Sequence, residues 1–327
     1  MKQKLLEYLK CFSCGGDFVL KDEQRDGAEI ISGALVCGGC ALEFPVLRGI
    51  PRMLPINQQA ANKNIAERFG YEWKLFSKFY DLYQEQFLDW IKPVEADFFK
   101  GKVILDGGCG KGRHIRLAAK FGAKEAIGID LSEAVEVAYL ETKHLPNVHI
   151  IQADLFHLPL KTVFDYIYSI GVLDHTIDPY MAFHGLTTLL KPGGKISAWV
   201  YSREGNDWIM NVVDPLRLKV TSRLPLPILK VLSYFLASII WVMTRLVYKQ
   251  LNAVPGLRHI LFYRDYMVSI ADFPLNELTA IVFDHLGPPS VYYLTKEEVT
   301  EWFSRDQMKE VQITWRNKNS WRASGIK

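Results

Sequence analysis

The chain has 327 residues, with 39 Lys and Arg against 36 Asp and Glu, and a formal net charge of +3 at pH 7. The chain therefore lacks the strong basic excess that is typical of a dedicated nucleic-acid-binding protein. The length suits one α/β domain plus a smaller module or a large insertion, because a single core is not expected to use all of it. The first residues, MKQKLLEYLKC, lack the apolar core and cleavage site of a signal peptide, so we expect a cytoplasmic protein.

Four of the five cysteines form two knuckles, Cys11-x-x-Cys14 and Cys37-x-x-Cys40, with 22 residues between them. This spacing predicts a zinc-ribbon-like module over residues 1–55, in which four thiolates hold a structural zinc ion. Disulfides are the alternative, and a reducing cytoplasm disfavours them. Because the protein would fill all four zinc positions, we expect no catalysis by this metal.

After the Pro-rich segment 50–55, polar residues 57–64 predict a linker or the start of a helix. From Ile65 to Phe99 aromatic residues recur every three to four positions, which predicts amphipathic helices whose aromatic side chains mostly join the core. We therefore expect a helical cap over residues 56–100.

The most informative segment runs from Val103 to His114 (VILDGGCGKGRH), an apolar strand that leads through Asp106 and several glycines into a helix. Glycines allow the backbone to turn tightly against a ligand, and the helix N-terminus favours an anionic group there. A dinucleotide and S-adenosylmethionine both fit this arrangement. The dinucleotide fingerprint G-x-G-x-x-G would require glycine at Arg113, so the spacing disfavours the dinucleotide.

The chain resembles the class I S-adenosylmethionine-dependent methyltransferases, in particular those like type 11. Five segments carry the resemblance in order: 103–114, 126–130 (AIGID), 148–155 (VHIIQADL), 164–175 (FDYIYSIGVLDH) and 190–201, which holds a Leu-Lys-Pro-Gly-Gly turn. The resemblance implies an α/β, Rossmann-like fold with a seven-stranded sheet that is mostly parallel and has an antiparallel last strand. This domain would occupy residues 101–201 and 295–327.

The resemblance also implies which residues bind S-adenosylmethionine. Asp106 and the glycine loop would hold the methionine end, Asp130 would accept both ribose hydroxyls, and Asp154 would lie near the adenine amino group, although a loop-capping role for Asp154 is the alternative. Cys109 would be a small filler in the loop, without a catalytic role. The complete set of expected cofactor residues is Asp106, Gly108, Cys109, Gly110, Gly112, Asp130, Leu131, Asp154, Leu155 and Ser169.

A base that removes a proton from the acceptor should stand at the carboxyl end of the fourth or fifth strand. The motif match places Asp174 and His175 there, and Tyr201 ends the fifth strand. An imidazole exchanges protons most readily near neutral pH, so histidine is the better base, with a packing role as the alternative. Helices before the first strand commonly close over the cofactor in this family, so Phe69, Tyr71 or Trp73 could line the pocket.

The last part of the domain begins with a capping box at Thr295–Glu298, which predicts a helix to about Phe303. Residues 311–315 then predict the sixth strand and residues 321–326 the antiparallel seventh. Residues 202–294 remain as a helical lid insertion. It leaves the carboxyl end of the fifth strand, where the cofactor binds and the acceptor must approach.

Within the insertion, residues 231–244 carry no charge. As a helix they would reach about 21 Å, short of the roughly 30 Å of a bilayer core, so they predict no simple transmembrane span. A buried lid helix or a dimer contact is one alternative. The other is contact of residues 228–249 with the inner face of a membrane, for which six Lys and Arg against one Asp over residues 214–249 are suited.

The acceptor is not encoded in a motif. The fourth strand is followed by neither Asn-Pro-Pro-Tyr nor Asp-Pro-Pro-Tyr, which disfavours DNA amine methylation, and no cysteine is placed for carbon-5 methylation. Our leading hypothesis is methyl transfer to a small molecule, such as a glycan or a lipid-linked intermediate.

Two further hypotheses stay open. The ribbon resembles both small activators of methyltransferases and the ribbon of some 23S rRNA guanine methyltransferases, which suggests an rRNA base as acceptor. The latter ribbon commonly includes a histidine that this chain lacks at its second metal pair. The third hypothesis is a non-catalytic scaffold that binds the cofactor.

Overall fold

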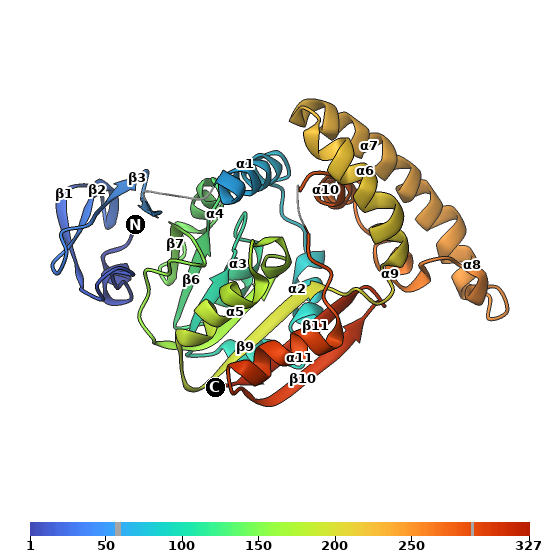
Figure 1. Ribbon diagram of the computed structural model, residues 1–327. Coiled ribbons are helices and arrows are strands. Elements are labelled where there is room, and N and C mark those ends of the chain that lie inside the picture. The colour runs from blue at the N-terminus through green and yellow to red at the C-terminus, as the bar shows by residue number, and fades with distance from the viewer. Residues whose placement is uncertain (56–59, 289–290) are drawn as a thin grey trace.

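The computed structural model describes residues 1–55, 60–288 and 291–327 and shows one large β-sheet with helices on both faces (Figure 1). The strands are β1 Phe18–Asp26, β2 Glu29–Cys37, β3 Glu43–Leu47, β4 Ile50–Met53, β5 Val103–Gly107, β6 Glu125–Asp130, β7 Val148–Ala153, β8 Phe164–Ile170, β9 Leu190–Tyr201, β10 Lys309–Arg316 and β11 Ser320–Ile326. Their order across the sheet is β1-β2-β3-β4-β7-β6-β5-β8-β9-β11-β10.

The helices of the domain and its cap are α1 Ala60–Leu75, α2 Leu82–Trp90, α3 Arg113–Lys120, α4 Val135–Thr142, α5 Pro179–Thr188 and α11 Lys296–Arg305. The inserted segment holds α6 Asp214–Lys219, α7 Leu226–Met243, α8 Lys249–Ala253, α9 Arg264–Ser269 and α10 Leu275–Leu286. Short helical turns include η3 Leu173–His175 and η6 Thr244–Tyr248. The predicted capping box is confirmed, since the Thr295 hydroxyl and the Glu298 carboxylate each accept the other residue's backbone N–H.

The methyltransferase-like part of the sheet has the predicted topology. Strands β7, β6, β5, β8 and β9 are parallel, and β11 pairs antiparallel with both β9 and β10. The Leu-Lys-Pro-Gly-Gly segment, predicted as a turn before the fifth strand, lies inside β9, where the pairing with β8 shifts between Phe164 and Tyr166.

The seven predicted strands are present as β5 to β11, and the sheet is larger than predicted, with eleven strands. Strand β4, which lies in the Pro-rich segment at the end of the ribbon, pairs in parallel with β7 through Arg52 and Met53. Pro51 is tolerated near the start of this short strand, where few ladder hydrogen bonds are needed. The antiparallel ribbon strands β1 to β4 therefore extend the central sheet.

The ribbon is tied to the domain by more than this strand pair. The Lys2 ammonium donates to the Val148 carbonyl at 3.0 Å, and the Lys10 N–H donates to the Pro159 carbonyl at 3.0 Å. The Lys161 N–H in turn donates to the Tyr8 carbonyl at 2.9 Å. These contacts join the first residues of the chain to the edge of the parallel sheet.

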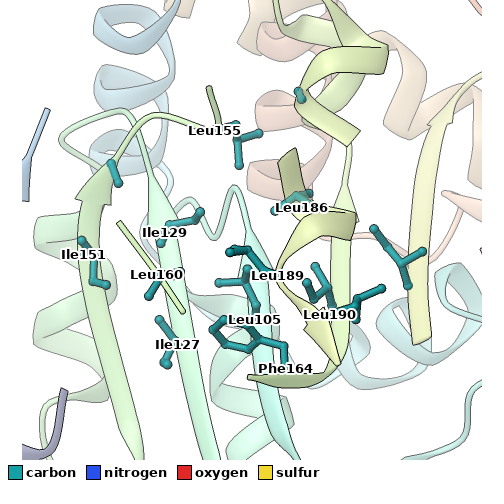
Figure 2. Close-up of a cluster of buried hydrophobic side chains, with 14 of the residues drawn as sticks. Leu105, Ile127, Ile129, Ile151, Leu155, Leu160, Phe164, Leu186, Leu189 and Leu190 are labelled. Carbon is teal, nitrogen blue, oxygen red and sulfur yellow. The ribbon is translucent and has the colours of Figure 1, made fainter. Parts of the chain in front are cut away.

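The central strands are buried on both faces, as their nearly continuous apolar sequence predicts. Leu105, Ile127 and Ile151 point to one face, where they pack with leucines such as Leu186 and Leu190 (Figure 2). The alternate residues on the same strands belong to a second core on the opposite face; these are Ile104, Ala126 and Ile150. This two-sided burial fixes the register of the strands, because a slip of one residue would exchange the faces.

The predicted cap over residues 56–100 contains helices α1 and α2. Residues 57–59 of the predicted linker lie outside the described part of the chain. The two ends of the 202–294 segment meet, because Ser202 bridges Leu294 and the Arg203 N–H donates to the Leu294 carbonyl at 3.0 Å. The segment thus leaves the sheet and returns to it at a neighbouring position.

Helix α7 continues through η6 and α8, so that one helix spans residues 226–253. By length and composition it could cross a membrane. The sequence analysis predicted no membrane span because it considered only the uncharged residues 231–244. The helix extends beyond this run at both ends, which the charge pattern does not reveal. In Figure 1 this long helix lies at the margin of the molecule, away from the sheet.

Candidate active site

A cavity of about 220 Å³ opens at the carboxyl ends of the parallel strands. Helices α1 and α2 of the cap and α9 and α10 of the insertion contribute residues to its wall. Nine of the predicted site residues line it: Gly108, Cys109, Gly110, Asp130, Leu131, Asp154, Leu155, His175 and Tyr201. Four others, Asp106, Gly112, Ser169 and Asp174, do not.

Asp130 ends β6 and ties the glycine loop to the next turn. Its Oδ2 accepts the Gly110 N–H at 2.8 Å, and its Oδ1 accepts the N–H and hydroxyl of Ser132 at 2.8 and 2.6 Å. A carboxylate offers about four lone-pair sites, so these three donors leave about one site free, and rotation of the Ser132 hydroxyl away from Asp130 would free a second. Burial raises the pKa of Asp130 above its ordinary value, and these three donors oppose that rise.

The glycine loop has conformations and close approaches that other residues would not tolerate. Gly108 has φ +92°, and a Cβ there would lie 2.3 Å from a methyl group of Val172. Gly110 has φ +50°, and a Cβ there would lie 3.1 Å from the Trp73 Nε1. Because these two glycines have no side chains, the backbone of the loop itself forms part of the cavity wall.

The predicted residues outside the cavity wall support the loop from behind. The Ser169 hydroxyl donates to the Gly107 carbonyl at 2.7 Å. A Cβ on Gly112 would lie 3.0 Å from the Ala138 Cα, so this glycine allows α3 to pack on α4. Asp106 is almost completely buried, and burial raises its pKa to about 8.

Replacing Asp106 with asparagine should flatten the pH dependence of stability. A carboxyl group whose pKa is raised from 3.8 in the unfolded chain to about 8 in the fold contributes stability fully below pH 4. That contribution declines as the pH rises through 8. We expect the melting temperature of Asp106→Asn to fall less than that of the wild type between pH 5 and pH 8. Equal pH dependence of the two proteins would contradict this assignment.

The three predicted catalytic residues lie close together, but their side chains point in different directions. His175 lines the cavity, with its ring 5.1 Å from that of Phe69. Asp174 is turned away, and its Oδ2 accepts the Tyr201 N–H at 3.0 Å. The Tyr201 hydroxyl donates to Asp284 Oδ2 at 3.4 Å, and burial raises the pKa of this phenol well above 10. Asp174 therefore joins η3 to β9, and Tyr201 presents a protonated hydroxyl.

Sequence reasoning missed a buried group of charged residues in the cavity wall. Lys111, inside the glycine loop, donates to the Phe76 carbonyl at 2.7 Å and the Tyr83 hydroxyl at 3.0 Å, and burial lowers its pKa to about 8. Tyr83 in turn donates to Glu277 Oε2 at 2.5 Å. Arg113 lies 3.5 Å from the other oxygen of Glu277. The position of Lys111 and Arg113 beside the motif was a usable signal, whereas nothing local marked Glu277.

Carboxyl groups outnumber cations in the cavity wall, with Glu72, Asp130, Asp154, Glu277 and Asp284 against Lys111, Arg113 and Arg316. Burial, followed by the nearby Asp284, raises the pKa of Glu72 well above its ordinary value. A positively charged ligand would stabilise the ionised form of such groups. S-adenosylmethionine carries a sulfonium and an ammonium group, so the residues present fit this cofactor.

The aromatic residues of α1 are divided between the cavity and the core. Phe69 and Trp73 line the cavity, as the family resemblance suggested. Tyr71 instead stacks on Phe283 with the ring centroids 6.2 Å apart. Trp90, Trp199 and Phe273 add further aromatic surface to the wall.

The four ribbon cysteines converge on one point. The Cys11 and Cys40 sulfurs lie 3.7 Å apart, those of Cys14 and Cys37 lie 3.4 Å apart, and all four lie within 4.8 Å of one another. Zinc–sulfur bonds of ~2.3 Å in a tetrahedron separate the sulfurs by about 3.8 Å, so the set is compatible with structural zinc. The separations are too long for disulfide bonds, which are ~2.05 Å.

Residues 105–198 match the protein family described as "Methyltransferase domain". The tRNA U34 carboxymethyltransferase of Pseudoalteromonas atlantica is 32% identical over 111 residues, which are 33% of this chain and 34% of that protein. The ubiquinone biosynthesis O-methyltransferase of Erwinia tasmaniensis is 31% identical over 134 residues, 38% of this chain and 53% of that protein. The chain thus spans about a third to a half of the length of these curated relatives.

Two solved structures are similar in outline. Magnesium protoporphyrin IX methyltransferase from Synechocystis PCC 6803 with bound S-adenosylmethionine aligns at 12% identity and a TM-score of 0.46, over 84% of this chain and 100% of that chain. A chain of the Haloferax volcanii complex between the Trm112 methyltransferase activator and a methyltransferase aligns at 15% identity and a TM-score of 0.46, over 83% and 98%.

The parallel sheet, the glycine loop and the acidic strand ends define a Rossmann-like cofactor-binding domain. With the match over residues 105–198, this domain is a class I S-adenosylmethionine-dependent methyltransferase domain.

Proposed function

We propose that the whole chain transfers a methyl group from S-adenosylmethionine to a small acceptor with a large apolar part. The observation that carries this proposal is the aromatic-rich cavity, which shares its wall with the glycine loop. The acceptor class we favour is a glycan or lipid-linked intermediate.

We also propose how the chain is divided. Residues 1–55 would form a zinc module, 56–100 a cap, 101–201 and 295–327 the catalytic domain, and 202–294 a lid. We propose that this protein is cytoplasmic.

For the cofactor, the strand ends would supply the binding groups. Asp130 would accept the ribose hydroxyls, Asp154 and Leu155 would border the adenine, and the backbone of Gly108 to Gly110 would lie against the methionine end. When bound, S-adenosylmethionine supplies an electrophilic methyl group with a neutral leaving group. The protein must therefore align the acceptor and exclude water rather than activate the donor.

For the acceptor, the cap and the insertion would supply the wall. Phe69, Trp73 and Phe273 offer flat apolar surfaces, which suit an acceptor with a ring or a chain. If the attacking atom is a hydroxyl oxygen, its proton must leave during transfer. His175 lies in η3, the turn that follows β8, where it lines the cavity and would take this proton. Asp174 would hold this turn in position, because its carboxylate accepts the Tyr201 N–H.

The acceptor class can be tested with labelled donor. The purified protein and S-adenosylmethionine labelled in the methyl group would be incubated with extract from cells that lack the gene, followed by separation into lipid, water-soluble and RNA fractions. We expect label in the lipid or small-molecule fraction. Label in RNA would overturn the proposal, and no label from a protein that binds the cofactor would favour a scaffold.

A tRNA acceptor is a second candidate, because relatives named tRNA U34 carboxymethyltransferases match about a third of the chain. It predicts binding that weakens steeply with salt, since phosphate contacts release counterions. Binding of tRNA that does not respond to salt, or no binding, would count against it.

The role of His175 can be separated from cofactor binding. We expect His175→Asn to lower the initial rate of label transfer by about 10²-fold, the usual contribution of a general base, with an unchanged affinity for S-adenosylmethionine. Tyr201→Phe, which keeps the ring and loses the hydroxyl, serves as the matched control and should lower the rate less than tenfold. An equal loss of rate and affinity in His175→Asn would instead indicate a packing role.

A further inference from the structure

The long helix of residues 226–253 has an unusual distribution of side chains, with large apolar residues on its outward face. Five of its side chains are buried against the protein: Leu229, Ser233, Ala237, Thr244 and Tyr248. Four of these five, all except Leu229, are small or carry a hydroxyl. Several large apolar side chains point outward, and Val231, Phe235 and Leu246 are 70%, 61% and 68% exposed. Others, such as Leu232 and Leu236, pack partly against the core. A helix on the surface of a water-soluble domain instead has mainly polar side chains on its outward face.

The exposed apolar surface continues on both sides of this helix. Before it, Val212, Leu216, Leu218 and Val220 are exposed, and after it Val254, Leu257, Ile260 and Phe262 are exposed. Soluble monomers rarely expose so many large apolar residues in one region. Something apolar should therefore cover residues 212–262.

The charges of the same region indicate what covers it. Residues 212–262 contain seven Lys and Arg and one acidic residue, Asp214; the seven are Arg217, Lys219, Arg223, Lys230, Arg245, Lys249 and Arg258. Some are neutralised locally, since Arg217 pairs with Asp214 and Lys249 with Asp272. Lys219, Lys230 and Arg258 are exposed, and none of them forms an ion pair within the described parts of the chain.

Large apolar side chains interspersed with unpaired cations match the surface of an anionic lipid bilayer, where acyl chains and phosphate groups lie close together. A second copy of this chain would place the same cations opposite one another, which is unfavourable. Nucleic acid would satisfy the cations and leave Val231, Phe235 and Leu246 exposed. The Arg245 guanidinium lies 4.2 Å from the Trp241 ring centroid, and such amphipathic side chains are common at the lipid–water boundary.

The contacts of the helix favour a position along the membrane surface rather than across it. Its inner face joins a core with Leu278, Val282 and Phe283 of α10. Further along, the Arg245 guanidinium donates to the Phe273 carbonyl at 3.0 Å and the Tyr248 hydroxyl donates to the Phe262 carbonyl at 2.7 Å. A helix that crossed a bilayer would have to give up these contacts along most of its length.

We propose that residues 212–262 bind the surface of an anionic membrane, with the outward face of the helix inserted among the lipid chains and the cations at the headgroups. Helix α10 lies between this surface and the cavity, because its Glu277 and Asp284 line the cavity while Leu278 and Val282 pack toward α7. The membrane would thus lie one helix away from the site. The proposal does not depend on the proposed function, since membrane binding is measured without cofactor or acceptor.

The test is co-sedimentation of the full chain with vesicles of phosphatidylcholine mixed with phosphatidylglycerol, compared with phosphatidylcholine alone. We expect at least tenfold stronger binding to the anionic vesicles, reduced by high salt. The variant Val231→Ser/Phe235→Ser/Leu246→Ser should bind at least tenfold more weakly and keep the wild-type melting temperature, because these side chains make few contacts. The matched control is Val19→Ser/Leu140→Ser, which changes apolar residues that are 57% and 61% exposed elsewhere and should bind like the wild type.

A second variant, Lys219→Glu/Lys230→Glu/Arg258→Glu, should lose the preference for anionic vesicles. Three results would overturn the proposal. The first is binding unaffected by the serine variant, and the second is a dimer that this variant dissociates, without vesicle binding by the wild type. The third is tRNA binding that the glutamate variant abolishes, again without vesicle binding. Resistance of the membrane-bound protein to alkaline extraction would show a span and also contradict the surface position.

Discussion

Replacing Asp130 with alanine should weaken the binding of S-adenosylmethionine by at least 10²-fold, as measured by calorimetry. The carboxylate holds Gly110 and Ser132 with three hydrogen bonds, so its loss loosens the loop as well as removing acceptors for the ribose. Hydrogen bonds to a charged group each contribute about 1.5–3 kcal/mol, and two ribose contacts together correspond to a factor of about 10² or more.

Two variants make this result specific. Asp130→Asn keeps the size of the side chain and one acceptor oxygen, so it should retain intermediate affinity. Asp97→Ala removes an exposed carboxylate that is paired with Lys100 far from the cavity, and it should bind like the wild type. Unchanged affinity in Asp130→Ala would mean that the cofactor lies elsewhere.

Removal of the metal should destabilise the whole chain and not the ribbon alone. We expect one zinc ion per chain by native mass spectrometry, and chelation or Cys37→Ser should lower the melting temperature by roughly ten degrees or more. The four thiols hold together a module whose strand β4 pairs with β3 on one side and with β7 of the parallel sheet on the other. Without the metal, β7 would lose this ordered neighbour.

The fifth cysteine supplies the control for this experiment. Cys109 is buried in the glycine loop, far along the chain from the metal cluster, so Cys109→Ala should keep the zinc and most of the stability. A chain that melts at the same temperature with and without chelator would contradict a structural role. Disulfide-linked peptides in the native protein would contradict the zinc site itself.

Much of the methyltransferase fold follows from local patterns. The apolar runs of β5, β6 and β8 are long enough for buried strands and too short for helices, and the glycines between β5 and α3 require a tight turn. The ends of these strands meet at one edge because parallel strands with helical crossovers must all point the same way. Asp130 and Asp154 could therefore be placed at the cavity from the sequence.

The part of the cavity wall that the cap and the insertion build could not be predicted in this way. Glu72, Glu277 and Asp284 come from a cap helix and an insertion helix about 200 residues apart, and no periodicity links them. The direction of the Asp174 side chain could not be predicted either, because the motif places the residue beside the cavity but does not reveal that its carboxylate accepts the Tyr201 N–H. Side-chain direction in a turn depends on the partners that packing provides.

By itself, the sequence determined the glycine loop and the four-cysteine cluster, because each depends on the spacing of residues along the chain, while the mostly parallel sheet followed from the family resemblance. The tertiary structure decided that β4 would extend the sheet to eleven strands, since edge pairing requires a partner distant in sequence. It also decided which face of helix 226–253 turned outward. A charge count finds an apolar helix, but packing against α10 selected Ser233 and Ala237 for the inside and left Phe235 outside.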